Sequence, residues 1–133
     1  MSSKLYNLPF TIEGTKSDIT YTPKDFKKKS IKKDDFKGAY IIFDLTTGQN
    51  YVGSSRKVKK ALFKIFKGKN SSMAEVYYGW KAGHEVTIQA VDIKDTDYRF
   101  VRNLRKGLRR IVAKYEKALA KEIKKLNISD DND

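Results

Sequence analysis

The sequence contains no cysteine, and it has only two prolines, one histidine and one tryptophan among 133 residues. The absence of cysteine excludes disulfides, thiolate metal sites and cysteine nucleophiles. No apolar run approaches the roughly 18 residues of a membrane span. Residues 1–10 also lack the apolar stretch of a secretory signal. We therefore expect an intracellular, cytoplasmic protein with no membrane partner.

Acidic residues are scarce relative to basic ones. Sixteen Asp and Glu stand against 29 Lys and Arg, which gives a net charge of +13. A field of that sign attracts polyanions, such as DNA, RNA, an anionic membrane or an acidic protein. The basic residues are clustered, which favours nucleic acid over a merely solubilising surface. Eight Tyr, seven Phe and one Trp argue against disorder, and the length suits one domain.

Residues 1–37 have the character of a basic N-terminal extension. Four apolar residues early in it could form a short strand or a clasp on the core: Leu5, Leu8, Phe10 and Ile12. Thr22 is a candidate N-cap with Pro23 at the first helical position. The stretch 24–37 holds seven lysines against three aspartates. It is interpreted as either a short basic helix or a mobile arm.

The centre of the chain predicts a hairpin followed by a helix. Residues 38–45 are apolar and β-branched, which indicates a strand buried on both faces, and 51–53 return as a second strand. Ser54 or Ser55 is expected to cap the next helix, which Gly68 ends. Its apolar face has helical spacing and consists of Val58, Ala61, Leu62, Ile65 and Phe66.

The remaining pattern predicts a helix, a strand and a long helix. Ser71 or Ser72 caps the first of these helices, which closes at His84, and 85–93 alternates like a strand with one buried face. The long helix is expected from Asp95 or Thr96 to Leu126, with Gly107 marking a bend or a close contact. The order ββααβα over 38–126 predicts an α+β domain with a small antiparallel sheet flanked by helices. Residues 127–133 are expected to be a disordered acidic tail.

The hairpin carries a recognisable motif. Gly38-Ala39-Tyr40 is followed, ten residues later, by Tyr51-Val52-Gly53-Ser54-Ser55. This pair of triplets, with the helices and the strand that follow, resembles the GIY-YIG nuclease domain. The resemblance covers residues 38–93 well and 97–126 loosely. It implies a GIY-YIG-like fold, a nucleic-acid substrate and, in active members, metal-dependent phosphodiester hydrolysis.

The motif has a physical rationale of its own. Tyr40 and Tyr51, on adjacent antiparallel strands, can project from one sheet face about 5 Å apart. Gly53 would let a phosphate approach the backbone. Ser54 and Ser55 would sit at a helix N-terminus, where free N–H groups favour phosphate. The alternative is that both tyrosines simply pack the core.

Much of the catalytic set that the resemblance implies is missing. The two tyrosines match, but the arginine expected on the first helix is replaced by Ala61, and Arg56 lies too early. The metal-binding glutamate is expected near Leu104-Arg105, and Glu116 is the first acid on that helix. Glu116 is expected to pair with neighbouring lysines. We therefore predict no metal or other cofactor, with Mg²⁺ required only if the chain is an active endonuclease.

The long helix carries eleven Lys and Arg against two acids between residues 99 and 126. The predicted function is binding of nucleic acid, DNA more than RNA, with little or no nuclease activity. The hairpin tyrosines are expected to share a hollow that lacks any carboxylate with this basic surface. The alternatives are an active divergent endonuclease using Tyr40, Tyr51, Arg56 and Glu116, and a module that binds an acidic protein. The predicted binding residues are Gly53, Ser54, Ser55, Lys57, Lys60, Lys64, Arg99, Arg102, Arg105, Arg109 and Arg110.

Overall fold

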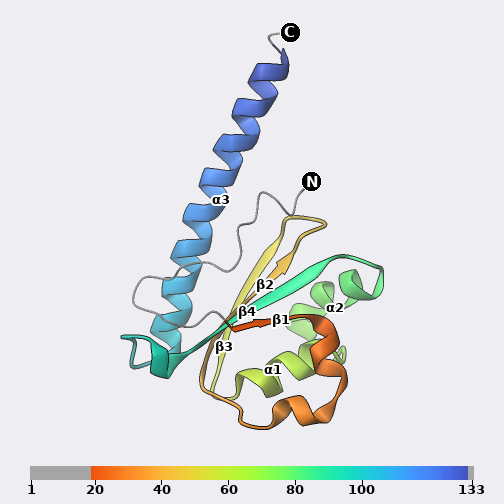
Figure 1. Ribbon diagram of the computed structural model, residues 1–133, viewed down its shortest axis with the longest axis vertical. Coiled ribbons are helices and arrows are strands. Elements are labelled where there is room, and N and C mark those ends of the chain that lie inside the picture. The colour runs from red at the N-terminus through yellow and green to blue at the C-terminus, as the bar shows by residue number, and fades with distance from the viewer. Residues whose placement is uncertain (1–18, 132–133) are drawn as a thin grey trace.

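The computed structural model describes residues 19–131, with backbone only at 115, 118–120 and 122–131. It confirms the α+β class, with one four-stranded antiparallel sheet and three α-helices (Figure 1). The strands are β1 (Ile19–Tyr21), β2 (Gly38–Asp44), β3 (Asn50–Ser55) and β4 (Val86–Asp92). The α-helices are α1 (Val58–Ile65), α2 (Ala74–Lys81) and α3 (Val101–Asp131). The 3-10 helices are η2 (Pro23–Lys27), η3 (Lys29–Lys32), η4 (Ser71–Met73) and η5 (Ile93–Asp95).

The strands lie in the order β1-β4-β2-β3. All seven residues of β2 are buried, as the apolar run predicted. The hairpin turn is held by Asp44, whose Oδ1 accepts from the backbone N–H of Thr46 at 3.0 Å and of Thr47 at 3.1 Å. Gly48 has φ +81°, the left-handed conformation that favours glycine. Among the described residues β3 pairs only with β2, so it is an edge strand of the sheet.

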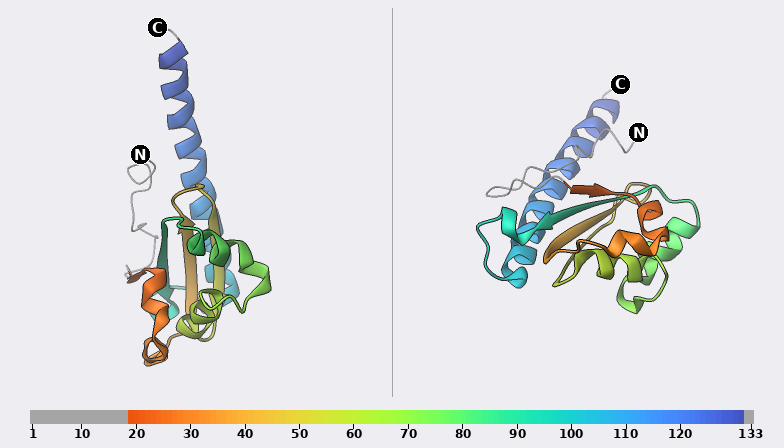
Figure 2. Two further views of the ribbon diagram at one scale, coloured as in Figure 1. Left: turned by 90° about the vertical axis from the view of Figure 1, so that its right-hand side faces the viewer. Right: turned by 60° about the horizontal axis from the view of Figure 1, so that its bottom comes forward.

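Helices cover both faces of the sheet (Figure 2). On one face, Ile41 and Phe43 pack against Leu104 and Leu108 of α3. On the other, Ile42 packs with residues of η2, α1 and α2, which include Phe26, Val58, Leu62 and Val76. β4 is consequently buried on both faces at Ile88–Val91, and the prediction that one of its faces is exposed was wrong. The alternating pattern predicted one buried face because it did not show that α3 covers the other face of the sheet.

The described part of the N-terminal segment belongs to the fold. β1 pairs with β4, with Ile19 opposite Ala90. The helix predicted at Pro23 exists as the short 3-10 helix η2, and its Phe26 is fully buried in the core. Asp25 Oδ2 accepts from the backbone N–H of Thr22 at 2.8 Å, which stabilises this start. The clasp predicted at Leu5–Ile12 lies outside the described residues.

The long helix differs from its prediction at both ends. Asp92 Oδ1 accepts from Lys94 N–H in η5, and α3 begins only at Val101. It continues to Asp131, beyond the Leu126 end that the apolar stripe suggested, because residues 127–131 contain no glycine or proline. Its C-terminal half extends past the sheet (Figure 1). Residues 132–133 of the predicted tail lie outside the described part of the chain.

Within the described residues, no helix has the length and apolar character that a membrane crossing requires.

Candidate nucleic-acid interface

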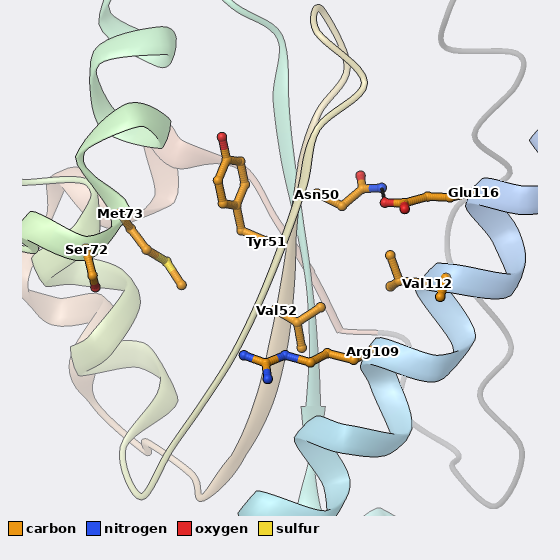
Figure 3. Close-up of a pocket in the computed structure, with 9 residues that line it drawn as sticks. Asn50, Tyr51, Val52, Ser72, Met73, Arg109, Val112 and Glu116 are labelled. Carbon is orange, nitrogen blue, oxygen red and sulfur yellow. Dashed lines mark hydrogen bonds between the residues drawn. The ribbon is translucent and has the colours of Figure 1, made fainter. Parts of the chain in front are cut away.

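The open edge of β3 lies between the α3 layer and the α1–α2 layer, and two hollows adjoin it. The first, which we call the strand-edge hollow, has a volume of about 440 Å³ (Figure 3). It is lined by Asn50, Tyr51, Val52, Ser72, Met73, Arg109, Val112, Ala113 and Glu116. Edge strands present unpaired backbone N–H and C=O groups, so the hollow combines backbone donors with side chains from both layers.

The second, which we call the lysine hollow, has a volume of about 350 Å³ and begins where β3 ends. It is lined by Ser55, Arg56, Lys57, Lys60, Ala61, Lys64 and Asn70. Four of these seven residues are cationic, and none is acidic. The loop and short helix from Asn70 to Met73 border both hollows. Together they make a basic surface along one side of the domain.

Arg109 joins α3 to this surface. Its side chain crosses Val52 of β3 toward the open edge (Figure 3). Arg105, one turn earlier, is half-buried, and its Nε is buried with no hydrogen-bond partner among the described residues. Asn50 Oδ1 is likewise buried with no hydrogen-bond partner among the described residues. Asn50 is the first residue of β3 and Arg105 belongs to α3, which packs on β3, so a ligand between them could supply the missing partners.

The arginines of α3 do not all share one surface. With 3.6 residues per turn, Arg102, Arg105 and Arg109 lie along one flank of α3, and Arg109 of this flank lines the strand-edge hollow. Arg110 is rotated about 100° from Arg109, away from the edge. Arg99 precedes α3. Arg99, Arg102 and Arg110 are exposed, and they line neither hollow.

The N-terminus of α1 is already occupied, which corrects the prediction of a phosphate site there. Asp35 Oδ1 accepts from the backbone N–H of Lys59 at 2.7 Å, and its Oδ2 accepts from Lys60 at 3.0 Å. Neither Ser54 nor Ser55 caps the helix, because both belong to β3. A carboxylate at this end satisfies free N–H groups and the helix dipole. The lysine side chains of α1, and not its backbone, are left to attract anions.

Gly53 also has a packing role that the sequence interpretation did not assign to it. It pairs with Tyr40 across β2 and β3, and a Cβ atom at Gly53 would lie 2.4 Å from Tyr40 Cζ. The glycine therefore admits the tyrosine ring, and the approach of a phosphate to its backbone stays a prediction. Tyr40 itself is 4 % exposed and belongs to the core, as the alternative interpretation of the motif held. Gly107 is similar: a Cβ there would lie 2.3 Å from the Tyr98 hydroxyl, so the predicted close contact exists.

Burial raises the pKa of Tyr40, and the positive charge of Arg105 lowers it by less. The two side chains are thus electrostatically coupled, although α3 lies on the opposite face of the sheet. Burial also raises the pKa of Tyr51, and the nearby Glu75 carboxylate raises it further. At neutral pH both phenols stay protonated. They are hydrogen-bond donors there, and a proton-accepting phenolate is disfavoured.

Carboxylates do reach the hollow that contains Tyr51, so the expectation of a hollow without them was wrong. The Tyr51 hydroxyl donates to Gln49 Oε1 at 2.7 Å, and Glu75 Oε2 lies 3.4 Å away. Glu116 lines the same hollow. Its Oε1 accepts from Asn50 Nδ2 at 2.7 Å, a contact between residues 66 positions apart. This bond replaces the lysine pairing predicted for Glu116.

The described residues contain no group of three or more His, Cys, Asp or Glu side chains placed to hold a metal ion. Arg56 is exposed in the lysine hollow, and Glu116 lines the strand-edge hollow. Neither hollow includes the buried Tyr40 among its lining residues. The four residues of the endonuclease alternative are therefore distributed over two hollows and the core.

One polar pair was missed by the sequence interpretation. His84 Nδ1 lies 2.8 Å from Asp44 Oδ2, and Asp44 is buried. Burial raises the pKa of this carboxyl, but hydrogen bonds from His84, Thr47 and Thr46 outweigh it and leave the pKa below its usual value. Asp44 thereby ties the hairpin turn to the end of α2. A lone histidine beside a glycine gave no signal of this partner.

Protein-family models, curated proteins and solved structures were each compared with the chain, and none of them matches it.

Proposed function

We propose that this chain is a GIY-YIG-like domain that binds nucleic acid along the open edge of β3, with little or no nuclease activity. The observation that carries the proposal is the convergence of cations from both layers on that edge. Lys57, Lys60 and Lys64 come from the α1 side, and Arg109 comes from α3. A single helix with a solvated basic face would not produce this two-sided arrangement.

The chemistry suits a phosphodiester backbone. Arginine presents a planar fork of donors to phosphate oxygens, and lysine presents a point charge. The protonated Tyr51 hydroxyl and the N–H groups of the β3 edge add neutral donors. None of these groups forms a base-reading pocket, so affinity is expected to be tolerant of sequence. The resemblance of the hairpin favours DNA over RNA as the ligand.

Such binding releases counterions, so its affinity must fall steeply with salt. For six to ten phosphate contacts, raising salt from about 50 to 200 mM weakens binding by roughly 10³- to 10⁵-fold. Fluorescence anisotropy of a labelled 20-base-pair duplex over this range tests the proposal. A flat salt response would remove the phosphate-contact model.

A second candidate is a divergent, metal-dependent endonuclease. The observation that favours it is the position of Glu116 in the same hollow as Tyr51 and Arg109. A carboxylate there could help hold a hard divalent cation. Incubation of supercoiled plasmid with the protein and Mg²⁺ or Mn²⁺ separates the two candidates. Cleavage that is lost in both Glu116→Ala and Tyr40→Phe proteins would establish the nuclease.

An acidic protein is the other class of partner that a basic strand edge can accept, because a peptide strand can add to it. A pull-down performed before and after nuclease treatment tests this directly. Under the nucleic-acid proposal, retained partners are released by nuclease. Partners that survive the treatment, together with no affinity for free DNA or RNA, would favour the protein-binding module.

A further inference from the structure

An aromatic surface on α2 has no part in either hollow. It consists of Tyr77, Tyr78 and Trp80. Tyr78 is 67 % exposed, so its ring contributes little to the core. Its centroid lies 5.4 Å from that of Tyr77, with the two rings at 68°. Large exposed apolar side chains in contact with one another are typical of binding surfaces.

The rings beneath Tyr78 are held in place by the fold. A Cβ atom at Gly68, where φ is +73°, would lie 2.8 Å from Tyr77 Cε2, so this glycine lets the Tyr77 ring lie flush on the loop. Trp80 packs edge-on against the buried Phe66, with centroids 5.8 Å apart. Tyr78 therefore projects from a fixed aromatic base, which reduces the conformational entropy lost when a ligand stacks on it.

Cations border the aromatic surface. Lys81 Nζ lies 5.7 Å from the centroid of the Trp80 ring. Lys67 and Lys69, which flank Gly68, are both exposed. Glu75, the one acid of α2, is also exposed, and its Oε2 lies 3.4 Å from the Tyr51 hydroxyl at the strand-edge hollow. Aromatic faces for bases and lysines for phosphates are the combination that single-stranded nucleic-acid sites use.

The surface is continuous with the proposed nucleic-acid interface. Asn70 lines the lysine hollow, Ser72 and Met73 line the strand-edge hollow, and α2 begins at Ala74. A nucleic-acid strand that leaves the hollows along residues 70–73 meets Tyr78 one turn into α2. A base can stack on a side chain only after it has left the duplex stack, so the chemistry selects unpaired nucleotides.

We propose that the aromatic surface binds an unpaired segment of DNA or RNA by stacking a base on Tyr78. The identity of the ligand as nucleic acid rests on the proposed function. The preference for single-stranded extensions goes beyond it. The protein then favours junctions, where a duplex lies along the β3 edge and a single strand crosses α2.

The test uses Trp80, which is the one tryptophan of the sequence and so reports from this surface alone. The full chain is titrated with a 20-base-pair duplex, with the same duplex carrying a ten-nucleotide overhang, and with the corresponding DNA and RNA single strands. We expect Trp80 emission to change with the ligands that carry unpaired nucleotides and not with the blunt duplex. Emission that responds equally to the blunt duplex would overturn the proposal.

Variants of Tyr78 sharpen the test. Stacking of one base predicts that Tyr78→Ala weakens overhang binding by about 5- to 150-fold, whereas Tyr78→Phe keeps the ring and the affinity. Phe100→Ala is the matched control, because Phe100 is 64 % exposed but precedes α3. Equal affinities for Tyr78→Ala and the wild-type chain contradict base stacking and point to a protein ligand for this surface. Equal losses in Tyr78→Ala and Tyr78→Phe also contradict it.

The two proposals fail separately. If blunt duplex binds with a steep salt dependence and Tyr78 variants change nothing, the aromatic proposal fails while the β3-edge proposal stands. If single strands bind through Tyr78 but duplex does not bind, the β3-edge proposal fails alone. Circular dichroism of each variant verifies the fold, which substitution of a 67 % exposed side chain should leave intact.

Discussion

The ring of Tyr40 fills the space that a side chain on Gly53 would occupy. The two residues are partners across β2 and β3, and the nearest Tyr40 ring atom would lie 2.4 Å from a Cβ at Gly53. That separation is far inside the 3.5–4.0 Å optimum for carbon atoms. The glycine of the second triplet is thus required by the tyrosine of the first. Tyr40 and Gly53 of the motif therefore have a structural explanation that needs no ligand.

This pairing predicts a context-dependent cost. Gly53→Ala should destabilise the protein by about 1–3 kcal/mol, because the new methyl group overpacks against the ring. Tyr40→Leu removes the ring atoms that the methyl would meet, so Gly53→Ala should cost much less in that background. A double-mutant cycle measured by urea unfolding gives both values. The same cost in both backgrounds would mean that the ring is not the obstacle.

Asp35 should contribute to stability through α1. Its carboxylate accepts two N–H groups of the first turn, so Asp35→Ala is expected to lower the free energy of unfolding by about 1–2 kcal/mol. Asp34→Asn is a matched control, because Asp34 is exposed and asparagine tolerates its φ of +53°. Chemical denaturation of the two variants side by side provides the comparison. A loss as large in Asp34→Asn as in Asp35→Ala would contradict this role.

Asp44 predicts a particular dependence of stability on pH. Its pKa is lower in the folded protein than in the unfolded chain, because hydrogen bonds from His84, Thr47 and Thr46 outweigh the effect of burial. The stabilisation is present above the unfolded value of about 3.9 and is lost as pH falls through the folded value. Asp44→Asn should therefore be less stable than the wild type at pH 7, with a smaller difference at pH 3.

Unfolding of both proteins at the two pH values measures this difference. The amide of Asp44→Asn can still accept from Thr46 and Thr47, so the variant mainly removes the charge. A difference in unfolding free energy that is the same at pH 7 and pH 3 would show that the carboxylate's ionisation does not contribute to stability.

The local pattern of apolar residues predicted those elements whose burial does not depend on distant parts of the chain. The run 38–45 indicated a doubly buried strand, and the spacing of Val58, Leu62 and Ile65 indicated α1. β1 could not be predicted, since its three residues become a strand only by pairing with β4, about 70 positions later. The alternation of β4 gave the wrong burial because it did not show that α3 packs on the second face of the sheet.

The candidate site was harder to predict than the fold, because its decisive contacts are long-range. The bond between Asn50 and Glu116 spans 66 positions, and the Asp35 contact with Lys59 spans 24. Nothing in the local sequence shows that a carboxylate fills the start of α1 or reaches the strand-edge hollow. The basic character of α1 and α3 was evident from the sequence, but its division into edge-facing and outward-facing residues needed the packing of α3 on β2 and β3.

That division allows the most direct test of the β3-edge interface. Arg109 and Arg110 are neighbours on one helix with the same charge and are both exposed, but only Arg109 lines the strand-edge hollow. The measurement is duplex DNA affinity as a function of salt for Arg109→Gln and Arg110→Gln. The β3-edge interface predicts that Arg109→Gln reduces the magnitude of the salt slope by about one phosphate contact and weakens binding at every salt concentration. Arg110→Gln should match the wild-type chain. Equal effects of the two substitutions, or a larger one for Arg110→Gln, would show that nucleic acid does not bind along the β3 edge.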